Sequence, residues 1–187
     1  MRGTLFLVVG PSGAGKDSLI DGARAELAGR RDIVFASRVI TRPPKSGDED
    51  NLFATAEEFA AMQATGAFML HWEAHGLFYG IPAEAAHLLA CGTSIVANVS
   101  RSVLPAARAT FQPAHILSVL VPRDVLAKRL RARGREDEGD IADRLRRAEA
   151  FDVSGDDVST ILNGGSLATG IGAVSYTHLT LPTTLVV

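Results

Sequence analysis

A short apolar segment near the start of this chain runs directly into a glycine-rich loop. Residues 5–9 read Leu-Phe-Leu-Val-Val, and residues 10–18 read Gly-Pro-Ser-Gly-Ala-Gly-Lys-Asp-Ser. The apolar run is typical of a buried strand, and residues 16–28 have the spacing of an amphipathic helix. The glycines let the connecting backbone curl, so that its N–H groups and the helix N-terminus can surround one anion. The order of strand, loop and helix therefore predicts an α/β unit with an anion-binding turn.

The loop matches the pattern Gly-x-x-x-x-Gly-Lys, in which the backbone cradles the phosphates of a nucleoside triphosphate. Lys16 is expected to reach the β- and γ-phosphates. The pattern usually continues with a hydroxyl residue that ligates Mg²⁺, but Asp17 stands there and Ser18 follows. Both side chains offer the hard oxygen that Mg²⁺ prefers, so the metal ligand stays open between them. The residues expected to bind the nucleotide are Gly10, Pro11, Ser12, Gly13, Ala14, Gly15, Lys16, Asp17 and Ser18.

The bulk properties of the chain limit the classes of function. Its 187 residues suffice for one domain with small insertions, and its net charge of −2 argues against nucleic-acid binding. A single cysteine, Cys91, excludes an internal disulfide and suits a reducing compartment. The first apolar run ends at the phosphate loop without a cleavage site, and no run is long enough to span a bilayer. We therefore expect a soluble cytoplasmic enzyme that acts on small molecules.

Short apolar runs alternate with helical patterns along most of the chain. Strands are expected at residues 4–9, 33–36, 94–99, 115–121 and 158–162. Helices are expected at residues 16–28, 102–110, 123–133 and 141–151. This alternation predicts a three-layer α/β/α fold with a parallel sheet, which binds ligands at the carboxyl ends of its strands.

Residues 38–80 interrupt the alternation, and we interpret them as a small substrate-binding insert. They begin with a polar loop at 38–52, continue with a capped helix at 55–65, and end in a hairpin of strands at 68–75 and 77–81. Pro82 is expected to open the next helix. The arginine-rich residues 131–147 are interpreted as a lid. The core of this single domain would then comprise residues 1–37, 81–130 and 148–173.

Residues 174–187 differ in character from the rest of the chain. They carry no charged side chain apart from a histidine, His178, and they resemble translated sequencing-adapter sequence. We expect them to be a non-native tail and leave them out of the fold prediction.

Transfer of a phosphoryl group joins two anionic reactants, so positive side chains must neutralise them. Arg42 and Lys45 in the polar loop are predicted to clamp an anion, as are Arg133 and Arg144 in the lid. The remaining arginines near the lid, Arg129, Arg131, Arg146 and Arg147, are interpreted as solvated surface charges. Tyr79 follows an aromatic residue and precedes a glycine, so its hydroxyl could point at a phosphate. A tyrosine that only packs within the hairpin of the insert would show the same pattern.

Taken together, these motifs resemble the guanylate kinase family. The shared segments are residues 10–16, Thr41-Arg42-Pro43-Pro44-Lys45 with Gly47, Gly76-x-x-Tyr79-Gly80, and Arg129-Leu130-x-x-Arg133-Gly134 followed by Arg144. Gly15-Lys16-Asp17-Ser18 and Trp72-x-x-His75-Gly76 make the chain more similar to one branch, the ribose 1,5-bisphosphate phosphokinases. The resemblance covers residues 1–168 or so. It implies a P-loop nucleoside-monophosphate-kinase-like fold, the use of ATP and Mg²⁺, and the conversion of ribose 1,5-bisphosphate to 5-phosphoribosyl 1-diphosphate.

The resemblance also implies roles for individual side chains. Lys16, Arg133 and Arg144 would stabilise the transferred phosphoryl group, and Asp17 or Ser18 would hold Mg²⁺. The acceptor substrate would be bound by Arg38, Arg42, Lys45, Tyr79 and Asn98.

Three positions depart from the pattern by which guanylate kinases recognise guanine. Arg38 and Leu70 stand where that family has a serine and a glutamate, and Asn98 replaces an acidic residue. A leucine accepts no hydrogen bond from a guanine N–H, which costs about 1–3 kcal/mol for each lost partner. We therefore expect an acceptor without a base, whose second phosphate binds Arg38. A guanylate kinase and a non-catalytic binding module remain as alternatives, and a homodimer is left open.

Overall fold

The computed structural model describes residues 2–43, 51–134, 137–150 and 152–175. The chain divides into two compact units. The first comprises Met1–Leu7 and Arg31–Ala114, and the second comprises Val8–Arg30 and His115–Val187. Strand β1 (Leu5–Val9) runs across the boundary, and all five of its residues are buried.

The first unit contains parallel strands, and three short helical segments lie between residues 84 and 110. β2 (Ile33–Phe35) and β7 (Ser94–Asn98) are parallel, with Ile33 opposite Ser94, and β7 neighbours β1 in the same sheet. The helical segments are α3 (Glu84–Ala90), the 3₁₀ helix η1 (Arg101–Val103) and α4 (Leu104–Thr110). The strands expected at residues 4–9, 33–36 and 94–99 are confirmed.

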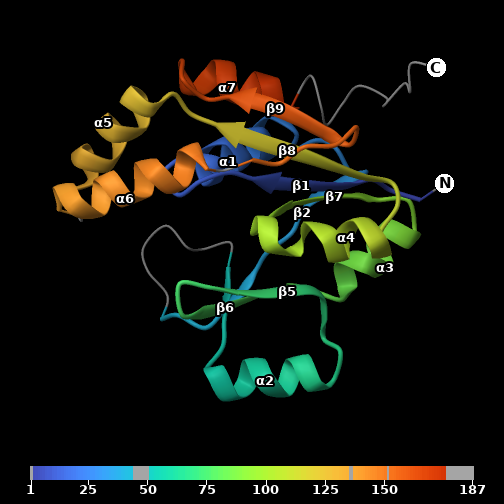
Figure 1. Ribbon diagram of the computed structural model, residues 1–187. Helices are drawn as coiled ribbons and strands as arrows, with labels where there is room; N and C mark the ends of the chain where they lie inside the picture. The colour runs from blue at the N-terminus through green and yellow to red at the C-terminus, as the bar shows by residue number, and fades with distance from the viewer. Residues whose placement is uncertain (1, 44–50, 135–136, 151, 176–187) are drawn as a thin grey trace. The chain divides into compact units, whose positions relative to one another are not determined.

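A second sheet in the first unit has the strand order β4-β3-β6-β5. Its strands are β3 (Val39–Ile40), β4 (Leu52–Phe53), β5 (Phe68–Ala74) and β6 (Leu77–Pro82). Helix α2 (Ala56–Ala64) lies beside β5 and β6 (Figure 1), where the Phe59 ring stacks on Phe68 and Phe78 at centroid distances of 4.5 and 5.7 Å. The predicted capping box is present at the start of α2, because Thr55 and Glu58 each accept a hydrogen bond from the other's backbone N–H.

Three local predictions in the first unit are wrong. Residues 38–52 were expected to be one loop, yet Val39 and Ile40 form β3 by pairing with Gly80 and Tyr79. A two-residue strand is too short to show a period in the sequence. Pro82 ends β6 opposite Phe68 instead of opening a helix, and α3 begins two residues later. The helix expected from residue 102 begins as η1 and becomes α-helical at Leu104.

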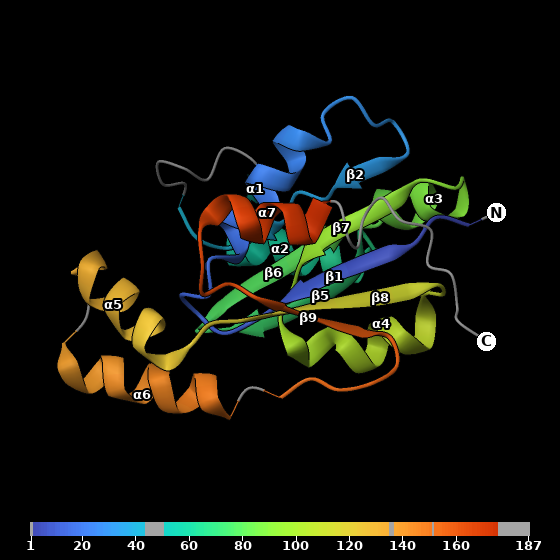
Figure 2. The ribbon, with the colours of Figure 1, turned by 90° about the horizontal axis from the view of Figure 1, so that it is seen from above.

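The second unit contains the loop after β1 and the rest of the parallel strands. Loop residues lead into α1 (Lys16–Glu26), and β8 (Ala114–Leu120) lies between β1 and β9 (Val158–Leu162) in strand order. Ile116 on β8 is opposite Val158 on β9 in a parallel register. Helix α7 (Leu167–Ser175) lies alongside α1 (Figure 2), so closely that a Cβ on Gly22 would come within 2.1 Å of the Ile171 side chain. The expected parallel sheet with flanking helices is confirmed.

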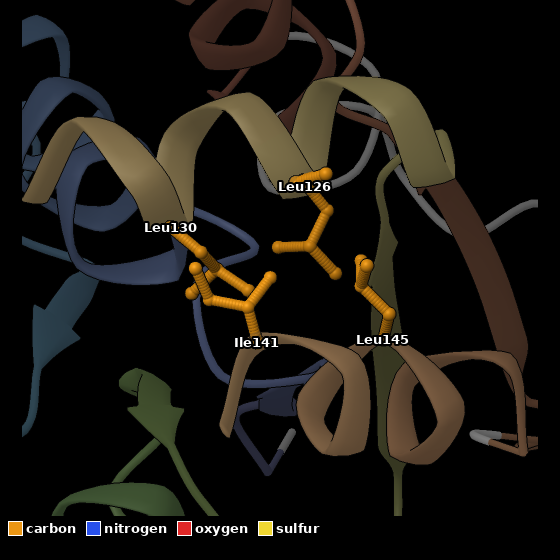
Figure 3. Packing of buried hydrophobic residues seen from close by; sticks show 5 residues of the cluster. Leu126, Leu130, Ile141 and Leu145 are labelled. Carbon is orange, nitrogen blue, oxygen red and sulfur yellow. The ribbon is translucent and has the colours of Figure 1, made fainter. Parts of the chain in front are cut away.

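Helices α5 (Arg123–Arg133) and α6 (Glu138–Glu149) form a hairpin with its own apolar cluster. Leu126 and Leu130 on α5 point toward Ile141 and Leu145 on α6 (Figure 3), and all four side chains are at most 7% exposed. The ion pair between Arg131 and Glu138 is solvent-exposed, and its hydrogen bond lowers the pKa of the glutamate. An exposed pair adds little stability, so the leucine cluster is the main contact between the two helices.

The end of the described chain adds one observation on the expected tail. Val174 and Ser175 belong to α7 and are buried, although they fall within the predicted 174–187 segment. Residues 176–187 lie outside the described residues. In the part of the chain that the structure describes, no helix is long and apolar enough to cross a membrane.

Shortening a side chain in the α5–α6 cluster is expected to destabilise the second unit. Leu130 is 1% exposed, and Leu130→Ala would leave a cavity that costs about 2–5 kcal/mol. Lys128→Ala, on an exposed position of the same helix, should change the free energy of unfolding by less than about 0.5 kcal/mol. Urea denaturation followed by circular dichroism measures both variants, and equal midpoints would contradict the role of the cluster.

Candidate active site

The phosphate loop has a backbone that only glycine accommodates at two positions. Gly13 and Gly15 have φ values of 89° and 82°, in the left-handed region that side chains with a Cβ rarely adopt. A Cβ at Gly13 would approach Leu126 Cδ1 to 2.8 Å, and a Cβ at Gly15 would approach Asn163 Nδ2 to 2.8 Å. The loop is therefore both tightly curled and tightly enclosed, and Gly15 directly precedes the first turn of α1.

The Lys16 ammonium lies against the loop. Its Nζ donates hydrogen bonds to the backbone oxygens of Gly10 at 2.8 Å and Pro11 at 3.1 Å. A phosphate held by the loop N–H groups would thus meet a positive charge already at the loop, as the sequence predicted for this lysine.

The α5–α6 hairpin brings one of the two predicted lid arginines to the loop. Arg144 on α6 donates a hydrogen bond from Nη1 to Ser12 Oγ at 2.6 Å. Arg133 is the last residue of α5, and its side chain lies outside the described part of the structure. The structure therefore joins Arg144 to the phosphate loop and leaves the position of the Arg133 guanidinium a prediction.

Asp17 and Ser18 are both exposed in the first turn of α1. Among the described residues there is no cluster of three or more histidine, cysteine or acidic side chains that could hold a metal by themselves. Mg²⁺ beside a nucleotide needs no such cluster, because it takes one or two protein oxygens together with phosphates and water. Either side chain fits that kind of site.

Two residues that were not predicted as site residues enclose the loop. Asn163, the first residue after β9, is 3% exposed and donates from Nδ2 to the Ala14 carbonyl at 2.7 Å. Its Oδ1 and the Nη1 of Arg129 are buried without a hydrogen-bond partner among the described residues, and that Nη1 lies 3.7 Å from a Cβ built on Gly15. Buried polar atoms normally find a partner, so these two fit a loop that holds a polar ligand.

The sequence contained a signal for each of these two residues, because Arg129 stands in a segment shared with the guanylate kinase family. Asn163 follows a predicted strand, at the carboxyl end where parallel sheets bind ligands. Arg129 was interpreted as a solvated surface charge, and the structure corrects this because its Nη1 is buried on the loop side of α5. Its burial depends on the position of α5 against the loop, which no local pattern reveals.

The first unit brings Tyr79 and Arg38 to one face of the second sheet. Tyr79 on β6 pairs with Ile40 on β3 and with Trp72 on β5. The pairing of Val39 with Gly80 puts Arg38 next to Ile81, whose neighbour on the other side is Leu70. Because paired residues share a face, Arg38, Leu70 and Tyr79 lie on the same side of this sheet.

For the other residues predicted to bind the acceptor, the structure gives the position in the fold and few side-chain contacts. Arg42 is half-buried just after β3, where Thr41 is tied to β6 by two hydrogen bonds with the Phe78 backbone. Arg38 donates from Nε to Asn51 Oδ1 at 3.2 Å. Asn98 is the last residue of β7 and is half-buried. Lys45 lies outside the described residues.

The comparisons with known proteins begin with a family model described as guanylate kinase, which matches residues 2–173. The chain belongs to the guanylate kinase family. Its fold agrees, because a crystal structure of guanylate kinase from Anaplasma phagocytophilum covers 93% of this chain and 83% of its own, with a TM-score of 0.65 at 21% identity.

Within the guanylate kinase family, the similar curated proteins point to one branch. Ribose 1,5-bisphosphate phosphokinase PhnN of Rhizobium etli (strain CIAT 652) is 48% identical over 167 residues, which are 89% of this chain and 84% of that protein. The protein of the same name from Thiobacillus denitrificans (strain ATCC 25259 / T1) is 49% identical over 150 residues, 80% and 79% of the two chains. The resemblance inferred from the motifs is thereby confirmed.

Asn163 offers a test of how the loop is held. Asn163→Asp keeps the size of the side chain but puts a carboxylate oxygen against the Ala14 carbonyl in place of the Nδ2 donor. We expect the free energy of unfolding to fall by about 1–3 kcal/mol. We also expect the KM for ATP to rise on the order of tenfold, because the loop loses its anchor.

Gln63→Glu makes the same chemical change at an exposed amide on α2 and serves as the control for denaturation and for ATP kinetics. If Asn163→Asp behaved like this control in both measurements, Asn163 would not anchor the loop.

Proposed function

We propose that this chain is a ribose 1,5-bisphosphate phosphokinase that transfers the γ-phosphoryl group of ATP to the 1-phosphate of its acceptor. The observation that carries this choice is the pair of residues flanking Ile81. Leu70 is 6% exposed and offers no hydrogen-bond acceptor, whereas Arg38 offers a positive charge on the same face. Such a face suits a phosphate and does not suit the polar edge of guanine.

The donor half of the proposal uses the phosphate loop. Residues 10–18 would hold the ATP phosphates through backbone N–H groups, with Lys16 at the β- and γ-phosphates and Arg144 and Arg133 at the transferred group. Asp17 or Ser18 would hold Mg²⁺, which neutralises charge on the phosphates. Arg42, Lys45, Tyr79 and Asn98 would bind the acceptor together with Arg38. In this proposal residues 38–80 are the acceptor-binding insert and residues 131–147 the lid.

The phosphoryl transfer needs only the kinds of group that these residues supply. An oxygen of the acceptor phosphate attacks the γ-phosphorus, the bond from that phosphorus to the ADP oxygen breaks, and the products are ADP and 5-phosphoribosyl 1-diphosphate. The second pKa of a phosphate monoester is about 6, so the nucleophile is already ionised at neutral pH and needs no general base. The protein contributes alignment and positive charge, which is what basic side chains and backbone N–H groups supply.

One assay separates this proposal from its rivals. Purified protein with Mg²⁺ and ATP is offered ribose 1,5-bisphosphate, GMP or no acceptor, and ADP release is measured. We expect turnover with the ribose substrate alone. Turnover with GMP alone would make the chain a guanylate kinase, and no turnover would favour a binding module.

Lys16→Met is expected to lower kcat at least about 10²-fold, because the loop loses the charge that lies against Gly10 and Pro11. Thermal melting is the control for folding of the variant. Unchanged turnover would exclude phosphoryl transfer at this loop.

Arg38→Ser tests the acceptor face, because serine restores the residue type that guanylate kinases have there. We expect the KM for ribose 1,5-bisphosphate to rise roughly 10- to 100-fold, as for the loss of one charge-assisted hydrogen bond, with the KM for ATP unchanged. Arg31→Ser removes an exposed arginine of the same unit and should change neither constant. An unaltered KM for the acceptor in Arg38→Ser would rule out this arginine as a ligand of the second phosphate.

A further inference from the structure

Trp72 is the single tryptophan of this chain, and its indole packs flat against Tyr79. The two ring centroids are 5.4 Å apart and the ring planes differ by only 6°. The two residues are directly opposite each other on β5 and β6, and Trp72 is 8% exposed. This is the offset-stacked geometry that aromatic pairs favour.

The hairpin of β5 and β6 has two faces with different partners. Phe68 and Phe78 lie on the face that packs on Phe59 of α2. Trp72 and Tyr79 lie on the opposite face, because adjacent residues of a strand point to opposite sides and Phe78 precedes Tyr79. The stack between Trp72 and Tyr79 is therefore separate from the packing that attaches α2 to the hairpin.

Tyr79 is constrained from both sides on its own face. Ile40 on β3 and Trp72 on β5 are its two cross-strand neighbours, and both are buried. A tyrosine ring has two side-chain torsions, and neighbours on both adjacent strands restrict both of them. The contacts of the ring thereby restrict the direction in which the phenolic hydroxyl points.

We infer that Trp72 is a positioning residue for the acceptor: its stacked indole holds the Tyr79 ring so that the phenol meets the acceptor phosphate. This inference rests on the proposed function, in which Tyr79 binds that phosphate. Trp72 makes no substrate contact in this scheme. Its effect reaches the substrate only through the orientation of Tyr79, so the two residues must be coupled in any measurement of acceptor binding.

The first test compares two substitutions of the indole. Trp72→Leu removes the stack while keeping a buried apolar side chain, and should raise the KM for ribose 1,5-bisphosphate about three- to tenfold with the KM for ATP unchanged. Trp72→Phe keeps a ring against Tyr79 and should stay within about twofold of the parent protein. If the KM for ribose 1,5-bisphosphate were equal in the parent protein, Trp72→Leu and Trp72→Phe, the positioning role would be overturned.

Phe59→Leu is the matched control for general loosening of the hairpin. Phe59 is buried, as Trp72 is, but it stacks on the other face, on Phe68 and Phe78. This variant should lower the melting temperature and leave the acceptor KM unchanged. An acceptor KM that rose equally in Phe59→Leu and Trp72→Leu would show that only hairpin stability matters, which contradicts the inference.

A double-mutant cycle tests the coupling directly. Tyr79→Phe removes the hydroxyl and should itself raise the acceptor KM. Adding Trp72→Leu to it should then have almost no further effect, because the orientation of a ring without a hydroxyl no longer matters to the phosphate. Full additivity of the two effects would overturn the inference.

Tryptophan emission gives a readout that does not depend on turnover or on any variant of Trp72. All tryptophan fluorescence of the chain comes from Trp72. Titration of ribose 1,5-bisphosphate should change this emission in the parent protein, and less in Tyr79→Phe. An emission that stays constant while the substrate turns over overturns the positioning role alone. Constant emission without turnover overturns the proposed function as well.

Discussion

The shape of the phosphate loop depends on close packing at two glycines. Leu126 of α5 fills the space beside Gly13, and the carboxamide of Asn163 fills the space beside Gly15 while it binds the Ala14 carbonyl. Protein interiors packed to this density deform little, so the loop, the start of α5 and the end of β9 hold one another in place. The Arg144 contact with Ser12 follows from the same arrangement, because the leucine cluster attaches α6 to α5.

The proposed acceptor face depends on the register of the β5–β6 hairpin. A shift of β5 by one residue would turn Leu70 and Trp72 to the face that packs on α2 and away from Tyr79. An irregularity between Phe68 and Leu70 interrupts the alternation there, so that Phe68 can pack on Phe59 while Leu70 joins Tyr79 on the other face. The missing Cβ of Gly80 makes room for the Phe68 ring, which would otherwise lie 2.4 Å away. The capped helix α2 thus covers one face of the hairpin, and Leu70, Trp72 and Tyr79 lie on the opposite face.

Segments whose residues favour one kind of element were predictable from the sequence, and the context-dependent ones were not. α5 and β9 have the expected bounds of 123–133 and 158–162, because α5 is rich in helix-forming residues and β9 in β-branched ones. β3 forms because β4 and β6 pair with it on its two sides, and Pro82 ends a strand because pairing with β5 outweighs its preference for a helix start. Asn163 was missed as a site residue for a related reason: its hydrogen-bond partner, Ala14, is 149 positions away in the sequence.

By itself, the sequence determined the strand-loop-helix order at residues 5–26 and the membership in the guanylate kinase family. It also determined that position 70 carries a leucine and not an acidic residue. Each of these follows from residue types and spacings along the chain, which need no distant partner to be recognised. Only the tertiary structure decided that Asn163 and Arg129 enclose the loop, and that Trp72 stacks on Tyr79. Those contacts join residues far apart in sequence or on paired strands, and their geometry is set by register and close packing.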